Sequence, residues 1–193
     1  MRAMSLAHQE PTVRVGVVVT FLRMDAPPQD IARKLPANAE VRRDRWCTVE
    51  QYRMLYNTVG GQYVWWLRRI VPDHALAAML RDTRVSIHIL HVDGEVAGFY
   101  ELDRTPWPTV NLSYFGLMPH AVGKGLGFAF LRHAVDTAWA MGPRAVTVNT
   151  CTADHPRALP TYVRAGFRPV RQVREEWNVP VRLGLDIPEA LRI

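Results

Sequence analysis

Three glycines alternate with Lys124 and Leu126 in the segment Gly123-Lys124-Gly125-Leu126-Gly127. The segment stands where a β-rich run ends and an apolar, helix-like run begins. Glycine lets the backbone approach a ligand closely and adopt positive φ angles. The start of a helix offers free N–H groups and the positive end of the helix dipole, and both favour phosphate. The segment therefore predicts a turn that binds a diphosphate, the alternative being a tight connection without a ligand.

Two other phosphate-binding turns are excluded by the same residues. A Walker-type loop needs Ser or Thr after Gly-Lys, whereas Gly125 follows Lys124 here. A Rossmann turn needs the pattern G-x-G-x-x-G, but Phe128 occupies its third glycine position. The next β-rich run also ends on Asn149 and Thr150 instead of an acidic residue. The turn is therefore expected to serve a different phosphate-bearing ligand.

The residues in front of the turn complete a longer motif. The stretch from Leu117-Met118-Pro119 to Gly127 resembles the first signature of the GNAT superfamily of acyl-CoA-dependent N-acetyltransferases. That signature carries Arg or Gln where this chain has Val122, so one side-chain contact to the diphosphate is missing and weaker cofactor binding is expected. The resemblance implies acetyl-CoA as co-substrate, bound by Leu117, Met118, Val122, Gly123, Lys124, Gly125, Leu126 and Gly127.

The second signature of the family is a helix with Asn-x-x-Ala-x-x-x-Tyr, followed by Gly-Phe. This chain keeps the spacing with His155 and Tyr162 and then Gly166-Phe167, and it departs from the pattern at His155, which replaces Asn. Pro160 lacks an N–H group and is expected to distort the first helical turn. The resemblance implies that His155 and Tyr162 contact the cofactor. Together the two signatures define an expected acyl-CoA-binding core over residues 85–177.

The resemblance also implies a reaction geometry. In this family two strands splay apart at their ends, backbone groups at Leu117 and Met118 bind the pantetheine arm, and an amide near Leu117 polarises the thioester carbonyl. An acceptor ammonium with a pKa of about 10 must lose a proton, and the leaving thiolate must gain one. Tyr162 matches the general acid of the family, the alternative being a core tyrosine. Glu101 is the predicted general base, acting through water, or else a surface carboxylate; its rivals are Asp103, Asp154 and His155.

Aromatic and polar side chains suggest where the acceptor binds. Five aromatic residues precede the core, where GNAT proteins place the wall of the acceptor site: Tyr52, Tyr56, Tyr63, Trp65 and Trp66. Tyr63 and Trp66 are predicted to contact the acceptor, the alternative being that the cluster is hydrophobic core. Asn111 and Ser113 are polar positions on an otherwise apolar strand, and they are predicted to line the same site or to face solvent.

The order of apolar and polar runs predicts the elements that hold these residues. We expect a leader over 1–12, a strand over 14–24, a flexible connection up to about 45, and helices over 48–57, 63–70 and 72–80. Thr48 has the spacing of a capping box. Strands over 85–92 and 95–102 flank Asp93-Gly94, a strong hairpin signal.

The second half of the chain continues this alternation. A strand over 110–117 is expected to place Asn111, Ser113 and Phe115 on one face and Leu112 and Tyr114 on the other. A helix over 125–141, a strand over 145–150, a helix over 155–165 and a strand over 167–177 follow, and the tail from 182 is too short to assign. The predicted fold is α/β, with a GNAT-like mixed, mostly antiparallel central sheet flanked by helices. The whole chain, 1–193, is expected to form one domain.

Composition limits the functional classes. The 193 residues are 48% hydrophobic and 22% charged, which is ordinary for a globular protein and argues against disorder. No apolar run is long enough to span a bilayer, and two cysteines make no disulfide framework, so a cytoplasmic location is expected. His88 and His91 have no ligand spacing around them, so no metal site is expected. The net charge of +6 comes from scattered arginines, which suits a phosphate-rich cofactor better than nucleic acid.

These observations lead to one predicted function with three rivals. The chain is expected to transfer acetyl from acetyl-CoA to a primary amine, with a small molecule favoured as acceptor over a protein. The rivals are a protein or peptide acetyltransferase, a non-catalytic acyl-CoA sensor suggested by Val122, and a nucleic-acid-binding protein. Dimerisation is common in the family, so a homodimer is an expectation that the resemblance carries.

Overall fold

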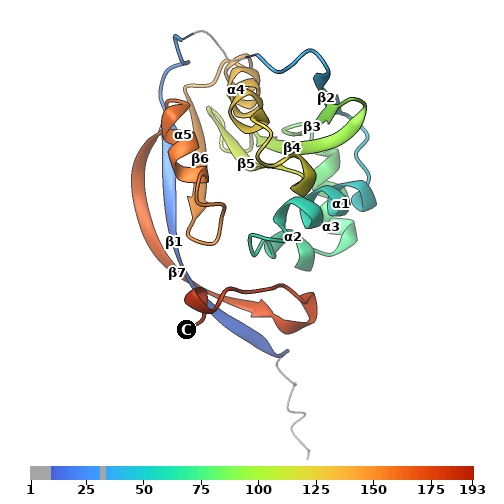
Figure 1. The fold of residues 1–193 in the computed structure, drawn as a ribbon, viewed down its shortest axis with the longest axis vertical. Helices are drawn as coiled ribbons and strands as arrows, with labels where there is room; N and C mark the ends of the chain where they lie inside the picture. Colours follow the sequence, from blue (N-terminus) through green and yellow to red (C-terminus); the bar gives the residue numbers. More distant parts are fainter. Residues whose placement is uncertain (1–9, 31–33) are drawn as a thin grey trace, which may run out of the picture.

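The computed structural model describes residues 10–30 and 34–193 and contains a seven-stranded sheet with the order β2-β3-β4-β5-β6-β1-β7 (Figure 1). Neighbouring strands are antiparallel except β5 and β6, which run parallel. The mixed, mostly antiparallel sheet flanked by helices is the predicted fold class, which is therefore confirmed. The strands are β1 (Thr12–Met24), β2 (Ala39–Asp44), β3 (Val85–Val92), β4 (Glu95–Asp103), β5 (Thr109–Leu117), β6 (Ala145–Cys151) and β7 (Arg168–Pro180).

Helices cover both faces of this sheet. They are α1 (Val49–Gly60), α2 (Leu67–Ile70), α3 (Asp73–Arg81), α4 (Leu126–Trp139) and α5 (Ala158–Arg164). On one face, Phe130 and Leu131 of α4 are fully buried in a cluster with Leu102 of β4. On the other face, Leu55 of α1 is fully buried in a second cluster with Phe99 of β4. Alternate residues of β4 therefore enter two different cores, as the two-residue period of a strand requires.

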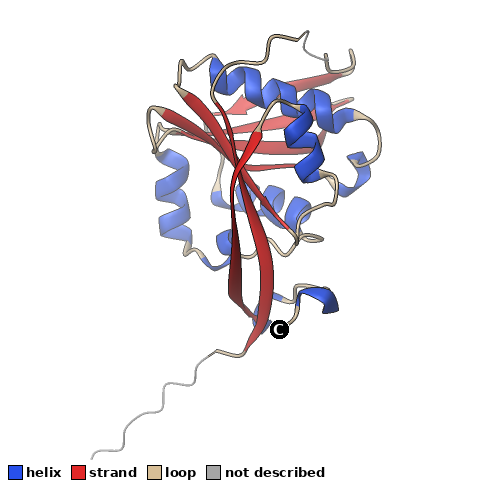
Figure 2. Cartoon of the chain, turned by 90° about the vertical axis from the view of Figure 1, so that its left-hand side faces the viewer, coloured by secondary structure: helices blue, strands red, loops and turns tan. Residues whose placement is uncertain are grey.

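Strands β1 and β7 run on together past the rest of the sheet as a two-stranded ribbon, which Figure 2 shows from the side. A third apolar cluster forms along this ribbon, where Val15 and Val179 are buried with Ile187 of the C-terminal segment. That segment folds back on β1, because Val15 pairs with Arg192 and the Ile193 amide donates to the Arg14 carbonyl at 3.2 Å. The tail left unassigned by the sequence is thus packed against the ribbon.

Local signals in the sequence are confirmed where they depend on neighbouring residues. The Thr48 hydroxyl accepts from the Gln51 amide at 3.2 Å and begins α1, as the capping motif predicts. Asp93 and Gly94 adopt positive φ angles of 51° and 84° between β3 and β4, as a tight hairpin turn requires. The predicted α4, β6, α5 and β7 also form, although α5 begins three residues later than expected, at Ala158, and β7 extends to Pro180.

Three predicted boundaries are wrong. Residues 39–44 form edge strand β2 and not a flexible connection; only Ala39 and Val41 pack against the core, so the apolar alternation is too short to mark a strand. Only Leu67–Ile70 of the predicted helix 63–70 is helical, because Val64 adopts a positive φ of 54° and the chain turns back on α1. A Cβ on Gly60 would lie 2.3 Å from the Trp65 Cβ, so this close return needs glycine. Of the predicted leader, residues 1–9 lie outside the described part of the chain, and β1 already begins at Thr12.

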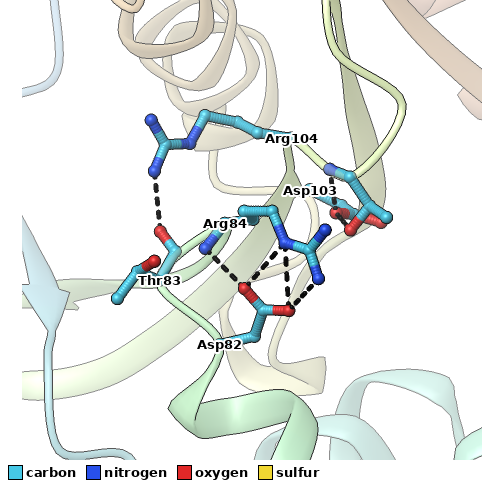
Figure 3. A network of polar contacts seen from close by, with 6 residues as sticks. Asp82, Thr83, Arg84, Asp103 and Arg104 are labelled. Carbon is cyan, nitrogen blue, oxygen red and sulfur yellow. Dashed lines mark hydrogen bonds and ion pairs between the residues drawn. The ribbon is translucent and has the colours of Figure 1, made fainter.

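A polar network joins the turn before β3 to the turn after β4 (Figure 3). Arg84 donates to both carboxylate oxygens of Asp82, with contacts of 3.0 and 2.6 Å. Arg104 donates to the Thr83 carbonyl at 2.7 Å, and its amide donates to the Arg84 carbonyl at 2.9 Å. The network lies at the sheet end opposite the glycine turn, and none of its residues lines the cavity described below.

Candidate active site

The central parallel strands separate, and a cavity opens between them. β5 pairs with β6 only from Thr109–Ala145 to Leu112–Val148, although both strands continue beyond that point. Beyond the last pair, residues 113–117 of β5 and 149–151 of β6 line a cavity of about 630 Å³. Figure 1 shows the two strands diverging. This is the splayed geometry that the resemblance implies.

A β-bulge marks the point where β5 leaves its partner. Glu101 of β4 pairs with Tyr114, whereas the next residue, Leu102, pairs with Leu112, so Ser113 is the extra residue. The bulge reverses the alternation of side chains. Tyr114 therefore packs with α1, while Leu112 packs with α4. The prediction that Leu112 and Tyr114 share a face was wrong for this reason.

The backbone of β5 presents a free edge to the cavity. The Met118 amide donates to the Ala97 carbonyl of the hairpin at 2.9 Å, so it points toward β4. Successive amides along a strand point to opposite sides, so the Leu117 amide points away from β4. Because β6 has already diverged there, no strand pairs with this edge of Leu117 among the described residues. Leu117 is thus the better placed of the two predicted backbone donors.

The glycine turn forms the start of α4 and one end of the cavity. Gly123 and Gly125 have φ angles of +82° and +77°, and a Cβ added to either would meet nothing within 4 Å. No side chain caps α4, so its first amides stay available. Val122, Gly123, Gly125 and Gly127 line the cavity, and Val122 is 40% exposed. The remaining predicted cofactor residues lie elsewhere: Met118 is buried near α1, and Lys124 and Leu126 line a separate cavity of about 100 Å³.

Tyr162 faces the same cavity from α5. Its ring packs edge-on against Phe115 and Phe167, at centroid distances of 6.4 and 6.0 Å. Burial raises the pKa of Tyr162 above its usual value, and the nearby Asp154 charge adds to the effect. The hydroxyl therefore keeps its proton at neutral pH. Among the described residues it has no hydrogen-bond partner, so it can donate to a ligand.

Glu101 is buried behind the cavity wall. It is 1% exposed, it accepts from the Tyr52 hydroxyl at 2.5 Å and from Arg68 at 2.8 Å, and it does not line the cavity. Burial raises its carboxyl pKa, against the lowering effect of Arg68. The Arg68 guanidinium also lies 5.3 Å from the Tyr114 ring centroid, so the ion pair supports the aromatic wall. The role of Glu101 as general base stays a prediction.

Some of the predicted acceptor residues line the cavity and others do not. Tyr63, Trp66 and Ser113 line the cavity, and so does His155. Asn111 does not; it donates to the Ser113 hydroxyl and accepts from Thr147, each at 3.0 Å, so it orients Ser113 from behind.

Sequence reasoning missed several lining residues altogether. Glu175 and Trp177 come from β7, Arg157 directly precedes α5, and Arg164 is the last residue of α5. The two arginines stand at positions that the second signature leaves variable, and the two β7 residues belong to no motif. The pairing of β7 with β1 brings Glu175 and Trp177 to the cavity, and only the folded sheet reveals it.

A model of the Acetyltransferase (GNAT) family matches residues 48–167. The chain belongs to this family. The match includes the strands that splay and the glycine turn, while β1, β2 and all of β7 lie outside it. The search of curated proteins found no match.

Solved GNAT structures share this fold at low sequence identity. A GCN5-related N-acetyltransferase from Sphaerobacter thermophilus is 17% identical with a TM-score of 0.60, over 90% of this chain and 54% of that one. A GCN5-related N-acetyltransferase from Kribbella flavida is 15% identical with a TM-score of 0.59, over 87% of this chain and 60% of that one. An aminoglycoside acetyltransferase from an uncultured soil metagenomic sample is 12% identical with a TM-score of 0.58, over 72% of this chain and 95% of that one. The chain thus spans little more than half the length of some GNAT structures that it matches.

GNAT proteins typically use acetyl-CoA as co-substrate, and the residues present fit this molecule. The open space above Gly123 and Gly125 gives a diphosphate room to contact backbone amides. Arg157 and Arg164 add positive charge to the cavity, and Arg164 lies over Phe128 in the first turn of α4, 4.2 Å from its ring centroid.

No group of three or more His, Cys, Asp or Glu side chains within residues 10–30 and 34–193 is arranged to hold a metal ion. No helix in the same ranges is both long and apolar enough to cross a membrane.

Proposed function

We propose that this GNAT protein transfers the acetyl group of acetyl-CoA to the primary amine of a small molecule. One observation carries the proposal: a single cavity joins the uncapped glycine turn, the free edge of β5 and an aromatic wall. The turn suits the diphosphate, the strand edge suits the pantetheine arm, and the wall suits an acceptor.

The chain's own groups account for binding of the cofactor. Backbone amides of Gly123, Gly125 and Gly127, helped by the helix dipole, hold the diphosphate. Arg164 compensates in part for Val122, which supplies no charged contact. Lys124 lies outside the main cavity, so its predicted help would come from the rim of the turn.

Three groups of the chain would serve the transfer itself. Acetyl-CoA, when bound, supplies an activated acetyl thioester. The Leu117 amide would donate to the thioester oxygen, an interaction typically worth ~3 kcal/mol in the transition state. Tyr162 holds the proton that the leaving sulfur needs. Glu101, as the predicted base, would act through water, since its carboxylate does not reach the cavity.

The cavity would hold the pantetheine arm and the diphosphate as well as the acceptor. Its total volume of about 630 Å³, within the ~300–1,000 Å³ of small-molecule sites, therefore leaves room only for a small acceptor. Aromatic side chains form much of its wall, whereas a peptide acetyltransferase is expected to offer a shallow open groove.

The proposal is tested by following thiol release from acetyl-CoA with a panel of primary amines and a panel of lysine-containing peptides. Acetyl-CoA affinity is measured separately by calorimetry. We expect at least one small amine to exceed every peptide in kcat/KM. Higher kcat/KM for peptides would favour the protein acetyltransferase, and bound acetyl-CoA without thiol release from any acceptor would favour the sensor.

A further inference from the structure

One carboxylate is held rigidly in the wall of the cavity. Asp154 follows β6, and its Oδ2 accepts from the Thr150 hydroxyl at 2.7 Å and the Cys151 amide at 2.9 Å. Its Oδ1 accepts from the Trp65 indole at 3.2 Å. A carboxylate oxygen can accept two hydrogen bonds, so Oδ1 retains an acceptor site, and Asp154 lines the cavity.

Two arginines and two carboxylates line the cavity. Arg164 packs on Phe128 and belongs to the cofactor end, whereas Asp154 is bonded to Trp65 in the connection between α1 and α2. The second lining carboxylate, Glu175, accepts from the Trp177 indole at 2.9 Å. Each of the two lining carboxylates thus accepts a hydrogen bond from an indole, and Arg157, which also lines the cavity, donates to neither of them among the described residues.

Aromatic rings surround Asp154. Trp65 lies 5.2 Å from Tyr56 and 5.1 Å from Tyr114 between ring centroids, and Tyr63 packs edge-on against His155 at 6.1 Å. Rings of this kind attract a cation through their faces and exclude water from an apolar group. The surroundings of Asp154 therefore suit a cation attached to an apolar body.

Asp154 lines the same cavity as Tyr162, the proposed proton donor. Burial raises the pKa of Tyr162 and of Tyr63, and the charge of Asp154 adds to both effects. A group held at Asp154 therefore shares the cavity with the position where the sulfur would leave.

We infer that Asp154 binds the acceptor's ammonium group and accepts its proton, and that the preferred acceptor is a primary amine on an apolar or aromatic body. This inference rests on the proposed function and names its acceptor class. It gives Asp154 the proton-accepting role that the sequence assigned first to Glu101.

The transfer balances with these groups. The ammonium gives one proton to Asp154, and the freed nitrogen lone pair forms the C–N bond while the C–S bond breaks. The sulfur leaves with the electron pair and takes the Tyr162 proton. The second proton lost by the nitrogen restores the Tyr162 hydroxyl, and Asp154 releases its proton to solvent.

The first experiment measures binding without turnover. Calorimetry compares 2-phenylethylamine with its neutral analogue 2-phenylethanol, each added to protein saturated with CoA. Wild type should bind the amine at least ~10-fold more tightly, the scale of a hydrogen bond to a charged group. Asp154→Asn should abolish this preference, and Asp186→Asn, at an exposed carboxylate that does not line the cavity, should retain it. A purely structural role of Asp154 would change both affinities equally, and that result would overturn the inference.

The second experiment measures transfer. Asp154→Asn should lower kcat/KM for 2-phenylethylamine by ~10²-fold, within the range of general base catalysis, and leave the thermal shift by acetyl-CoA unchanged. Wild type should prefer 2-phenylethylamine to phenylalanine, whose carboxylate Asp154 repels. It should also prefer 2-phenylethylamine to glucosamine, whose hydroxyls would lose their water against an apolar wall. A preference for phenylalanine or glucosamine, or full activity of Asp154→Asn, would overturn the inference. If no amine is acetylated but the preference for a cation still depends on Asp154, the proposed transfer fails while the ammonium site stands.

Discussion

A substitution in the glycine turn is expected to lower both the free energy of unfolding and the affinity for acetyl-CoA, and the two effects can be measured separately. Gly125 adopts a φ of +77°, where a residue with a Cβ loses about 2 kcal/mol. Unfolding entropy for 193 residues is ~0.4 kcal/mol/K at ~2.1 cal/mol/K per residue, so Gly125→Val should lower Tm by ~5 °C. Acetyl-CoA at 100 times its Kd contributes ~2.7 kcal/mol and should raise the wild-type Tm by ~7 °C. Because the new side chain occupies the space above the turn, Gly125→Val should show no such rise.

Gly184 provides the matched control. It adopts a φ of +59° with open space around its Cβ position, and it does not line the cavity. Gly184→Val should lose a similar amount of stability but keep the full rise in Tm with acetyl-CoA. Differential scanning calorimetry measures both quantities. A full rise in Gly125→Val, or equal loss of the rise in both variants, would refute the assignment of the turn to the diphosphate.

Three further predictions follow from single residues. Val122→Arg should leave acetyl-CoA affinity unchanged or tighten it by ~1 kcal/mol in calorimetry, and a clear loss would mean that the turn differs from that of the family. Tyr162→Phe should lower kcat by ~10²-fold with KM for acetyl-CoA little changed, and full activity would exclude the acid role. Burial, with Arg43 and His133, lowers the pKa of His88 to about 4, whereas an unfolded His titrates near 6.5. Below about pH 6.5 the unfolded chain binds the extra proton, so stability should fall by ~2 kcal/mol from pH 7.5 to 5 in urea titrations. His88→Phe should reduce that slope, and an unchanged slope would contradict the buried neutral imidazole.

The features that the sequence predicts well depend on residues close together in the chain. The left-handed backbone at Gly123 and Gly125, the cap at Thr48 and the hairpin at Asp93-Gly94 follow from the chemistry of a few adjacent residues. The same holds for the motif that places Tyr162 on a helix after β6. These local signals were enough to predict the family and the order of most elements.

The features that the sequence does not predict depend on pairing between distant segments. The extra residue Ser113 is a bulge only because β4 pairs on both sides of it. Glu101 looks like a free strand-end carboxylate until Arg68, from α2, binds and covers it. Trp177 reaches the cavity because β7 pairs with β1. None of these contacts produces a periodic pattern or a change of composition in the sequence.

The central claim, acetyl transfer to a small amine, is tested most directly by following the acetyl group itself. Wild-type protein is incubated with acetyl-CoA labelled in the acetyl carbons and with 2-phenylethylamine, and the products are analysed by mass spectrometry. The account predicts labelled N-acetyl amine and free CoA in equal amounts. Free CoA with unlabelled amine, or no product while calorimetry shows acetyl-CoA bound, would contradict it.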